Sequence, residues 1–197
     1  TPRNLFGFKD GTKNILADER EALDTHVWIQ PGDDPAAGWA AGGSYLIARR
    51  INMTVEVWDR QPLADQERLV GRTKGSGAPL SGGEEFDDPD FELGGIDNPV
   101  MPVDSHVAVM HPEHNGGIRM LRRGYNFVDG TDRLGAMDAG LFFLAFVRDP
   151  VLQFIPVQTK MARFDAMSEY LKFTSSAIFL VPPGVQPGQY VGQSLFT

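Results

Sequence analysis

The chain has 197 residues, 42% of them hydrophobic, which is enough to bury one main core. A net charge of −8 and a pI near 4.9 argue against a general nucleic-acid binder, because phosphate groups are neutralised by clustered Lys and Arg. The absence of cysteine excludes disulfides, thiolate metal ligands and iron–sulfur clusters. No apolar run approaches the roughly 18 to 20 residues that span a bilayer, so no membrane partner is expected.

The first part of the chain is rich in turn-forming residues. Residues 7–35 are predicted to form a loop, with one short strand at 27–29. A Gly-Gly pair then precedes residues 45–51, an apolar run of strand-forming residues that predicts a buried strand. We therefore divide the chain into an N-terminal segment, residues 1–41, which we expect to be the remnant of a preceding half, and a main domain, residues 42–197.

Helix signals follow the first strand. Thr54 can cap a first helix, and Pro62 separates that helix from a second one at residues 63–70. Gly71 is placed to end the second helix in a left-handed conformation. Residues 72–103 are rich in Gly, Pro and acidic residues. So long an irregular connection is unusual inside a compact domain and typically marks a functional or exposed loop.

Three more strands are predicted, at residues 118–127, 141–147 and 177–181. A helical segment at residues 151–171, broken near 162–164, lies between the last two. The resulting order is strand, helix, strand, strand, helix, strand. This order predicts an α+β, ferredoxin-like (βαββαβ) antiparallel sheet with helices on one face. The other face needs a partner, either a second such sheet or a flat cofactor.

Histidines are the first candidates for chemistry. His106 lies in a short apolar segment after a loop, where a protected neutral imidazole would be a good iron ligand. His106, His111 and His114 are alternatively ligands of one transition metal, although their spacing is not that of a helical metal motif. A satisfied polar or surface histidine is the ordinary alternative for each of them, and for His26.

Charged residues in unusual settings are the second group of candidates. Asp10 lies within a glycine-rich turn, which taken alone is an ordinary Asp-Gly turn. Arg122 and Arg123 are adjacent in an apolar strand, so one of them points where burial is expected and needs an anionic partner, unless the strand is an exposed edge. Asp165 and Glu169 are four residues apart on a predicted helix and share a face. Either could hold the Nδ1 proton of a ligating imidazole.

Taken together, these stretches resemble the dye-decolourising peroxidases, specifically their exported bacterial, deferrochelatase-like subgroup. The resemblance runs nearly the whole length, and the order and spacing of its motifs are more specific than any one of them. The matching stretches are residues 7–12 (the G-x-x-D-G signature), 43–51, 71–79, 104–106, 121–125, 140–143 and 179–184.

The resemblance implies a haem peroxidase built as a dimeric α+β barrel, of which this chain is the C-terminal, ferredoxin-like half that forms most of a haem b pocket. It implies that His106 is the iron ligand, that Asp10 moves the peroxide proton and that Arg122 stabilises the charge on the leaving oxygen. Glu169 fits the acid beside His106 best, with Asp165 the poorer match. The further haem-binding positions that it suggests are Asn14, Arg72 and Phe143.

The resemblance further implies hydrogen peroxide as oxidant and a dye, phenol or other organic donor as reductant. Family members are about twice this long, so we expect a missing N-terminal half or a second chain as partner, and a homo-oligomer stays open. Export to the periplasm or outside the cell is expected from the subgroup, with the signal upstream of residue 1. Two alternatives remain: a haem-handling protein that releases iron, and a non-catalytic haem-binding fragment.

Overall fold

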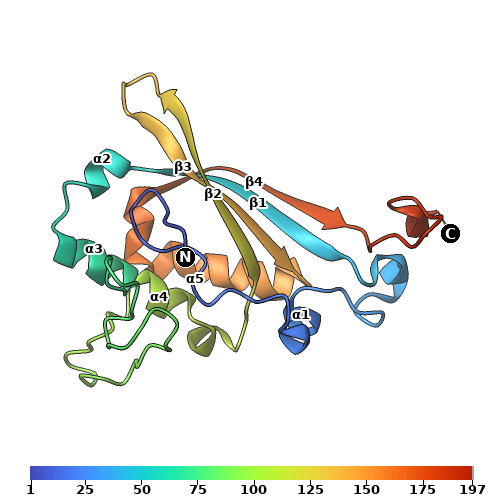
Figure 1. Cartoon of the computed structure of the whole chain (residues 1–197), viewed down its shortest axis with the longest axis horizontal. Helices are drawn as coiled ribbons and strands as arrows, with labels where there is room; N and C mark the ends of the chain where they lie inside the picture. The colour runs from blue at the N-terminus through green and yellow to red at the C-terminus, as the bar shows by residue number, and fades with distance from the viewer. Residues whose placement is uncertain (197) are drawn as a thin grey trace.

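The computed structural model describes residues 1–196, apart from the side chains of residues 35 and 36. Residue 197, the last of the predicted main domain, lies outside the described residues. The centre of the molecule is a four-stranded antiparallel sheet with strand order β2-β3-β1-β4 (Figure 1). Its strands are β1 (Ser44–Met53), β2 (Leu121–Thr131), β3 (Met137–Val147) and β4 (Leu171–Val181).

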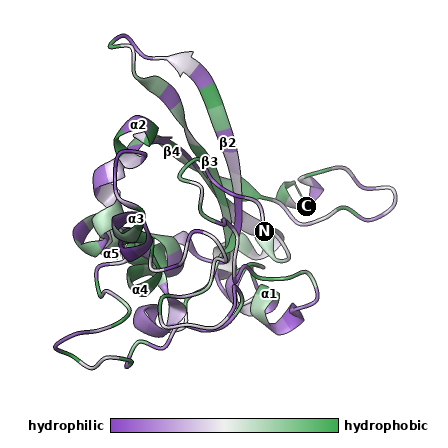
Figure 2. Cartoon of the chain, turned by 60° about the vertical axis from the view of Figure 1, so that its left-hand side comes forward, coloured by the Kyte–Doolittle hydropathy of each residue, from purple (hydrophilic) through white to green (hydrophobic). Residues whose placement is uncertain are grey.

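The helices are short, and α3, α4 and α5 gather on one side of the sheet (Figure 2). In the described part of the chain, no helix has both the length and the apolar character to cross a membrane. The α-helices are α1 (Arg20–His26), α2 (Val55–Trp58), α3 (Leu63–Val70), α4 (His106–Met110) and α5 (Ile155–Phe164). The other helical turns are η1 (Pro35–Ala40), η2 (Pro112–Asn115), η3 (Pro150–Phe154), η4 (Ala166–Tyr170) and η5 (Gln193–Leu195).

The predicted ferredoxin-like architecture is confirmed: β1, helices, β2, β3, helix and β4 follow one another in the expected order. The strands extend further than predicted, because β2 and β3 continue into a projecting hairpin (Figure 1) and β4 begins directly after η4. Gly71 ends α3 with a φ of 88°, as its position predicted. Thr54 precedes α2 without capping it, since its hydroxyl bonds the carbonyl of Tyr170 instead.

One local prediction is wrong. Residues 7–35 contain α1 rather than a strand at 27–29. No residue of α1 is buried, so this helix lacks the apolar face by which a helix is recognised in a sequence. The helical segment predicted at 151–171, with a break near 162–164, is confirmed: it consists of η3, α5 and η4, and the break falls at Asp165, which leaves the helical conformation and starts η4.

The two faces of the sheet differ in what covers them. One face lies under α5 and carries the buried side chains of Ile47, Ala145 and Val147, against which Phe154 packs. The opposite face carries partly or fully exposed apolar residues, among them Phe142 and Phe179, which are 41% and 54% exposed. The helices therefore define one side of the domain, and the other side of the sheet is bare in this chain.

The N-terminal segment packs into the same core as the main domain. Phe6 and Phe8 are buried beside Trp58 and Met53, and the rings of Phe6 and Trp58 stack at 4.2 Å. The indole N–H of Trp58 also donates to the carbonyl of Phe6 at 3.1 Å. These contacts anchor the turn that carries Asp10. That residues 1–41 are the remnant of a preceding half stays a prediction.

Candidate active site

His106 is the first residue of α4, and a buried carboxylate orients its ring. The Ser105 side chain caps the helix by accepting from the Ala108 N–H at 3.3 Å. The Nδ1 atom of His106 lies 2.6 Å from Oδ2 of Asp165, whose side chain is fully buried. A carboxylate accepts hydrogen bonds, so the proton belongs on Nδ1 and the lone pair on Nε2 is free for a ligand.

Asp165, rather than Glu169, is the acid beside His106, so the prediction that favoured Glu169 is wrong. Asp165 lies between α5 and η4, where its Oδ1 accepts from the Met167 N–H at 2.9 Å. The chain leaves α5 at this point, and the two acids no longer share a helix face. Glu169 is exposed. The prediction assumed that one helix carries both acids, whereas α5 ends before Asp165, which caps η4 instead.

Asp10 and Arg122 come together on the helix-covered face of the sheet. The guanidinium of Arg122 donates to the carbonyl of Thr12 at 3.1 Å. Gly124, two residues further along β2, points to the same face, and a Cβ added there would lie 3.3 Å from Oδ2 of Asp10. The carboxylate thus occupies space that a side chain at position 124 would fill.

Asn14 joins the turn of Asp10 to β2. Its side-chain amide donates to the Arg122 carbonyl at 2.8 Å, and its oxygen accepts from the Arg122 N–H at 2.9 Å. These two hydrogen bonds resemble those between paired β-strands, and they fix the position of the Asp10 turn relative to β2. Phe143 lies opposite Gly124 in the sheet register and therefore on the same face. Asn14 therefore contacts the strand that carries Arg122, and Phe143 shares its face of the sheet. That Asn14 and Phe143 contact a cofactor stays a prediction.

Positive charge accumulates next to this pair. Burial lowers the pKa of Arg122, Asp10 opposes that shift by its charge, and the nearby Arg119 adds to it. Arg72 is only 8% exposed and donates to the carbonyls of Gly77 and Glu85, each at 2.7 Å. Burial also lowers the pKa of Arg72, and the charge of Arg122 adds to that shift. These arginines form a site that would favour an anionic ligand.

Three residues of this region escaped the sequence analysis. Lys13 has a left-handed φ of 57°, a strained conformation that often marks functional turns, and its ammonium lies 3.0 Å from Asp88. The Lys13 hydrogen bond lowers the pKa of Asp88, and the charges of His111 and Arg72 add to that shift. Neither the backbone angle nor the approach of the distant loop has a sequence signal.

Glu85, the third, holds the Asp10 turn from both sides. Its carboxylate accepts from Lys9 at 2.5 Å and from Thr12 at 3.1 Å, and the Thr1 hydroxyl also donates to it. The bond from Lys9 lowers the pKa of Glu85 most, and the Thr1 hydroxyl adds to that effect, giving a value of about 2. The carboxylate is therefore ionised at any ordinary pH, and it is a structural clamp on the turn.

The three histidines proposed as one metal site have separate partners. His106 faces Asp165, whereas Nδ1 of His114 lies 2.7 Å from the Ala108 carbonyl and His111 caps η2. Among residues 1–196, no group of three or more His, Cys, Asp or Glu side chains is arranged to hold a metal ion. The histidine-cluster alternative therefore has no support in the geometry.

Fold and site together define an α+β domain of the ferredoxin-like class, with a carboxylate-held imidazole and an Asp–Arg pair on its helical side. The family described as "Dyp-type peroxidase, C-terminal" matches residues 1–186, and the chain belongs to this family. It is 41% identical over 197 residues to a dye-decolorizing peroxidase of Thermobifida fusca, and 38% identical over 198 residues to a deferrochelatase of Yersinia pestis.

Each of these alignments covers 99% of this chain and 45% of the relative, so the chain spans about half the length of the curated relatives it matches. Among solved structures, an oxyferrous complex of DtpA from Streptomyces lividans matches with a TM-score of 0.91 and 40% identity. That match covers 99% of this chain and 53% of the DtpA chain.

Proposed function

We propose that this chain is the haem-binding half of a peroxidase that reduces hydrogen peroxide with electrons from an organic donor. The observation that carries the proposal is the 2.6 Å contact between His106 Nδ1 and the buried carboxylate of Asp165. Such a partner fixes a ligating imidazole and makes it a stronger donor to a metal. Family membership supplies the class of reaction.

The donor set fits haem b. One neutral imidazole with a free Nε2 is the protein ligand that haem iron takes in peroxidases. Arg72 and Lys13 offer positive charge for the two propionates, with Asn14 beside them. When bound, haem would supply the redox chemistry of peroxide reduction and donor oxidation. His106 would hold the iron, and Asp165 would hold His106.

Asp10 and Arg122 would act on the peroxide itself. The Asp10 carboxylate would accept the proton of one peroxide oxygen and return it to the other, which becomes water. The Arg122 guanidinium, partly desolvated beside it, would stabilise the negative charge that develops on the departing oxygen. Asn14 and Glu85 would keep the turn and the strand in register, so that both groups stay aimed at the same oxygen.

The second half of the enzyme would cover the bare face of the sheet. Exposed Phe142 and Phe179 lie there, on the side away from α5. The relatives are about twice as long as this chain, and their remaining length is enough for one more domain. We also propose export from the cytoplasm, as the likeness to deferrochelatases suggests.

Rapid mixing with peroxide tests the proposed roles. In haem-loaded Asp10→Ala and Arg122→Ala, the bimolecular rate of the reaction with hydrogen peroxide should fall about 10²- to 10³-fold. Arg123→Ala is the matched control, because Arg123 is exposed on the other face of β2 and should react as the parent does. Parent-like rates in both variants of the pair would refute the assignment.

Iron release from haem is the second candidate function, favoured by the 38% identity to a deferrochelatase. Mass spectrometry of the tetrapyrrole after incubation separates the two functions. Metal-free protoporphyrin should accumulate only if the protein removes iron. If the haem stays intact after many turnovers of peroxide, only the peroxidase function remains.

A further inference from the structure

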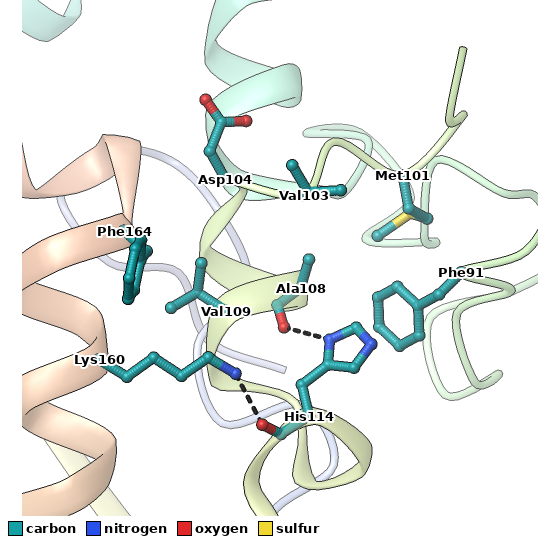
Figure 3. Close-up of a pocket in the computed structure, with 9 residues that line it drawn as sticks. All are labelled: Phe91, Met101, Val103, Asp104, Ala108, Val109, His114, Lys160 and Phe164. Carbon is teal, nitrogen blue, oxygen red and sulfur yellow. Dashed lines mark hydrogen bonds between the residues drawn. The ribbon is translucent and has the colours of Figure 1, made fainter. Parts of the chain in front are cut away.

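A cavity of about 400 Å³ lies between α4, α5 and the long loop that precedes α4 (Figure 3). This volume is in the range of small-molecule sites. The residues that line the cavity include Phe91, Val103, Ala108, Lys160 and Phe164.

The cavity is separate from the candidate active site. Ala108 and Val109 line the cavity and follow His106 by two and three residues, about 200° and 300° round the helix axis, so the cavity lies beside the His106 side of α4. Neither Asp10, Arg122 nor His106 lines the cavity. The helix that carries His106 thus forms one wall of a second cavity, which none of these three side chains lines.

Lys160 gives the cavity a positive charge without a carboxylate partner. Its ammonium donates one hydrogen bond, to the carbonyl of His114 at 2.7 Å, and has two further N–H groups (Figure 3). No ion pair of Lys160 occurs among the described residues. Asp104, the acid that lines the cavity, is engaged by Arg68 at 3.0 and 3.2 Å. An anionic ligand would complete the charge balance.

The remaining walls suit an aromatic ring. The ring of Phe91 packs on that of His114 at 4.4 Å, and His114 is itself fixed by its bond to the Ala108 carbonyl. Phe164 and Val103 are 60% and 77% exposed and stand at the rim. Aromatic rings pack well against such surfaces. The ligand class that satisfies both features is a small aromatic carboxylate.

We propose that this cavity binds a phenolic carboxylate as electron donor, with its carboxylate on Lys160. This inference rests on the proposed function, which supplies the oxidant. The phenol O–H bond breaks, its electron passes to the peroxide-oxidised enzyme and its proton goes to water. Two such donors reduce one hydrogen peroxide to two waters. The donor enters against α4, on the His106 side rather than the Asp10–Arg122 side.

Binding is tested by calorimetry with 4-hydroxycinnamate and its methyl ester, which share the ring and differ in the charge. The haem-loaded parent should bind the acid about tenfold more tightly than the ester. Lys160→Met should abolish this preference, whereas Lys172→Met, a change at an exposed lysine of β4, should keep it. Equal affinities for acid and ester in the parent, or an undiminished preference in Lys160→Met, would overturn the proposal.

Turnover tests the donor role. Val103→Trp narrows the mouth at an exposed position, so folding should be unaffected. The KM for 4-hydroxycinnamate should rise at least fivefold, and the rate of reaction with peroxide should stay that of the parent. An unchanged KM would overturn the donor assignment. If the parent fails to bind haem, the proposed function fails, and the acid-over-ester preference of the same haem-free protein still decides whether the binding site exists.

Discussion

Replacing Asp165 with asparagine should loosen the iron ligand without disturbing the fold around it. Asparagine keeps the shape, and its oxygen can still accept one of the two bonds, from His106 at 2.6 Å or from the Met167 N–H at 2.9 Å. The lost charge removes a hydrogen bond to a charged group, which is worth about 1.5–3 kcal/mol. Replacing the residue that hydrogen-bonds a metal-ligating histidine lowers metal affinity about 10- to 100-fold, which is roughly 1.4–2.7 kcal/mol of binding free energy. The two figures agree.

Titration with haemin, followed by the Soret absorbance, measures this loss. Asp165→Asn should bind haemin about 10- to 100-fold more weakly than the parent and release it faster to an excess of apomyoglobin. The matched control is Glu169→Gln, which changes an exposed acid four residues away and should leave the affinity unchanged. Parent-like affinity in Asp165→Asn, or an equal loss in both variants, would refute the role given to Asp165.

Two further predictions concern stability. Since the pKa of Glu85 falls from 4.5 to about 2 on folding, its ionised form stabilises the protein above pH 4.5 and that stabilisation is lost as the pH falls toward 2. Glu85→Gln should therefore lower the free energy of unfolding in urea by about 2 kcal/mol at pH 7. The difference from the parent should shrink as the pH falls from 4.5 toward 2. A difference that does not change with pH would contradict the role of Glu85 as a clamp on Lys9 and Thr12. Gly71→Ala should cost about 1–3 kcal/mol in thermal unfolding, because φ is +88° and the new Cβ would lie 2.8 Å from Ser105 Oγ; a parent-like Tm would contradict this.

The order of strands and helices along the chain was predictable because the signals for these elements are local. The runs at residues 45–51 and 141–147 are rich in the apolar and aromatic residues of buried strands, and Gly71 stands directly after an amphipathic stretch. The helix α1 was missed because it buries no side chain and offers no periodicity. Its position is held by an ion pair from Glu19, the residue before it, to Arg119 at 3.0 Å, a contact 100 residues away in the sequence.

The site was only partly predictable for the same reason. Arg122 was recognisable as a charge within an apolar strand, and His106 as an imidazole in a protected segment. The choice between Asp165 and Glu169 depended on where α5 ends, which the capping bonds of Asp165 decide. Lys13 has a left-handed backbone conformation, which the identity of a single residue does not predict. The cavity behind α4 is built by a loop without regular structure, whose path no periodicity describes.

Haem binding by this chain depends on the proposed bond between the His106 imidazole and the iron. The most direct measurement is an absorption and electron paramagnetic resonance titration of haemin into the parent, His106→Ala and His114→Ala. The parent and His114→Ala should both show the spectrum of ferric haem with one histidine ligand. His106→Ala should lose that spectrum, and imidazole added in solution should restore it. The same histidine-ligated spectrum and affinity in His106→Ala without added imidazole would contradict the proposed bond.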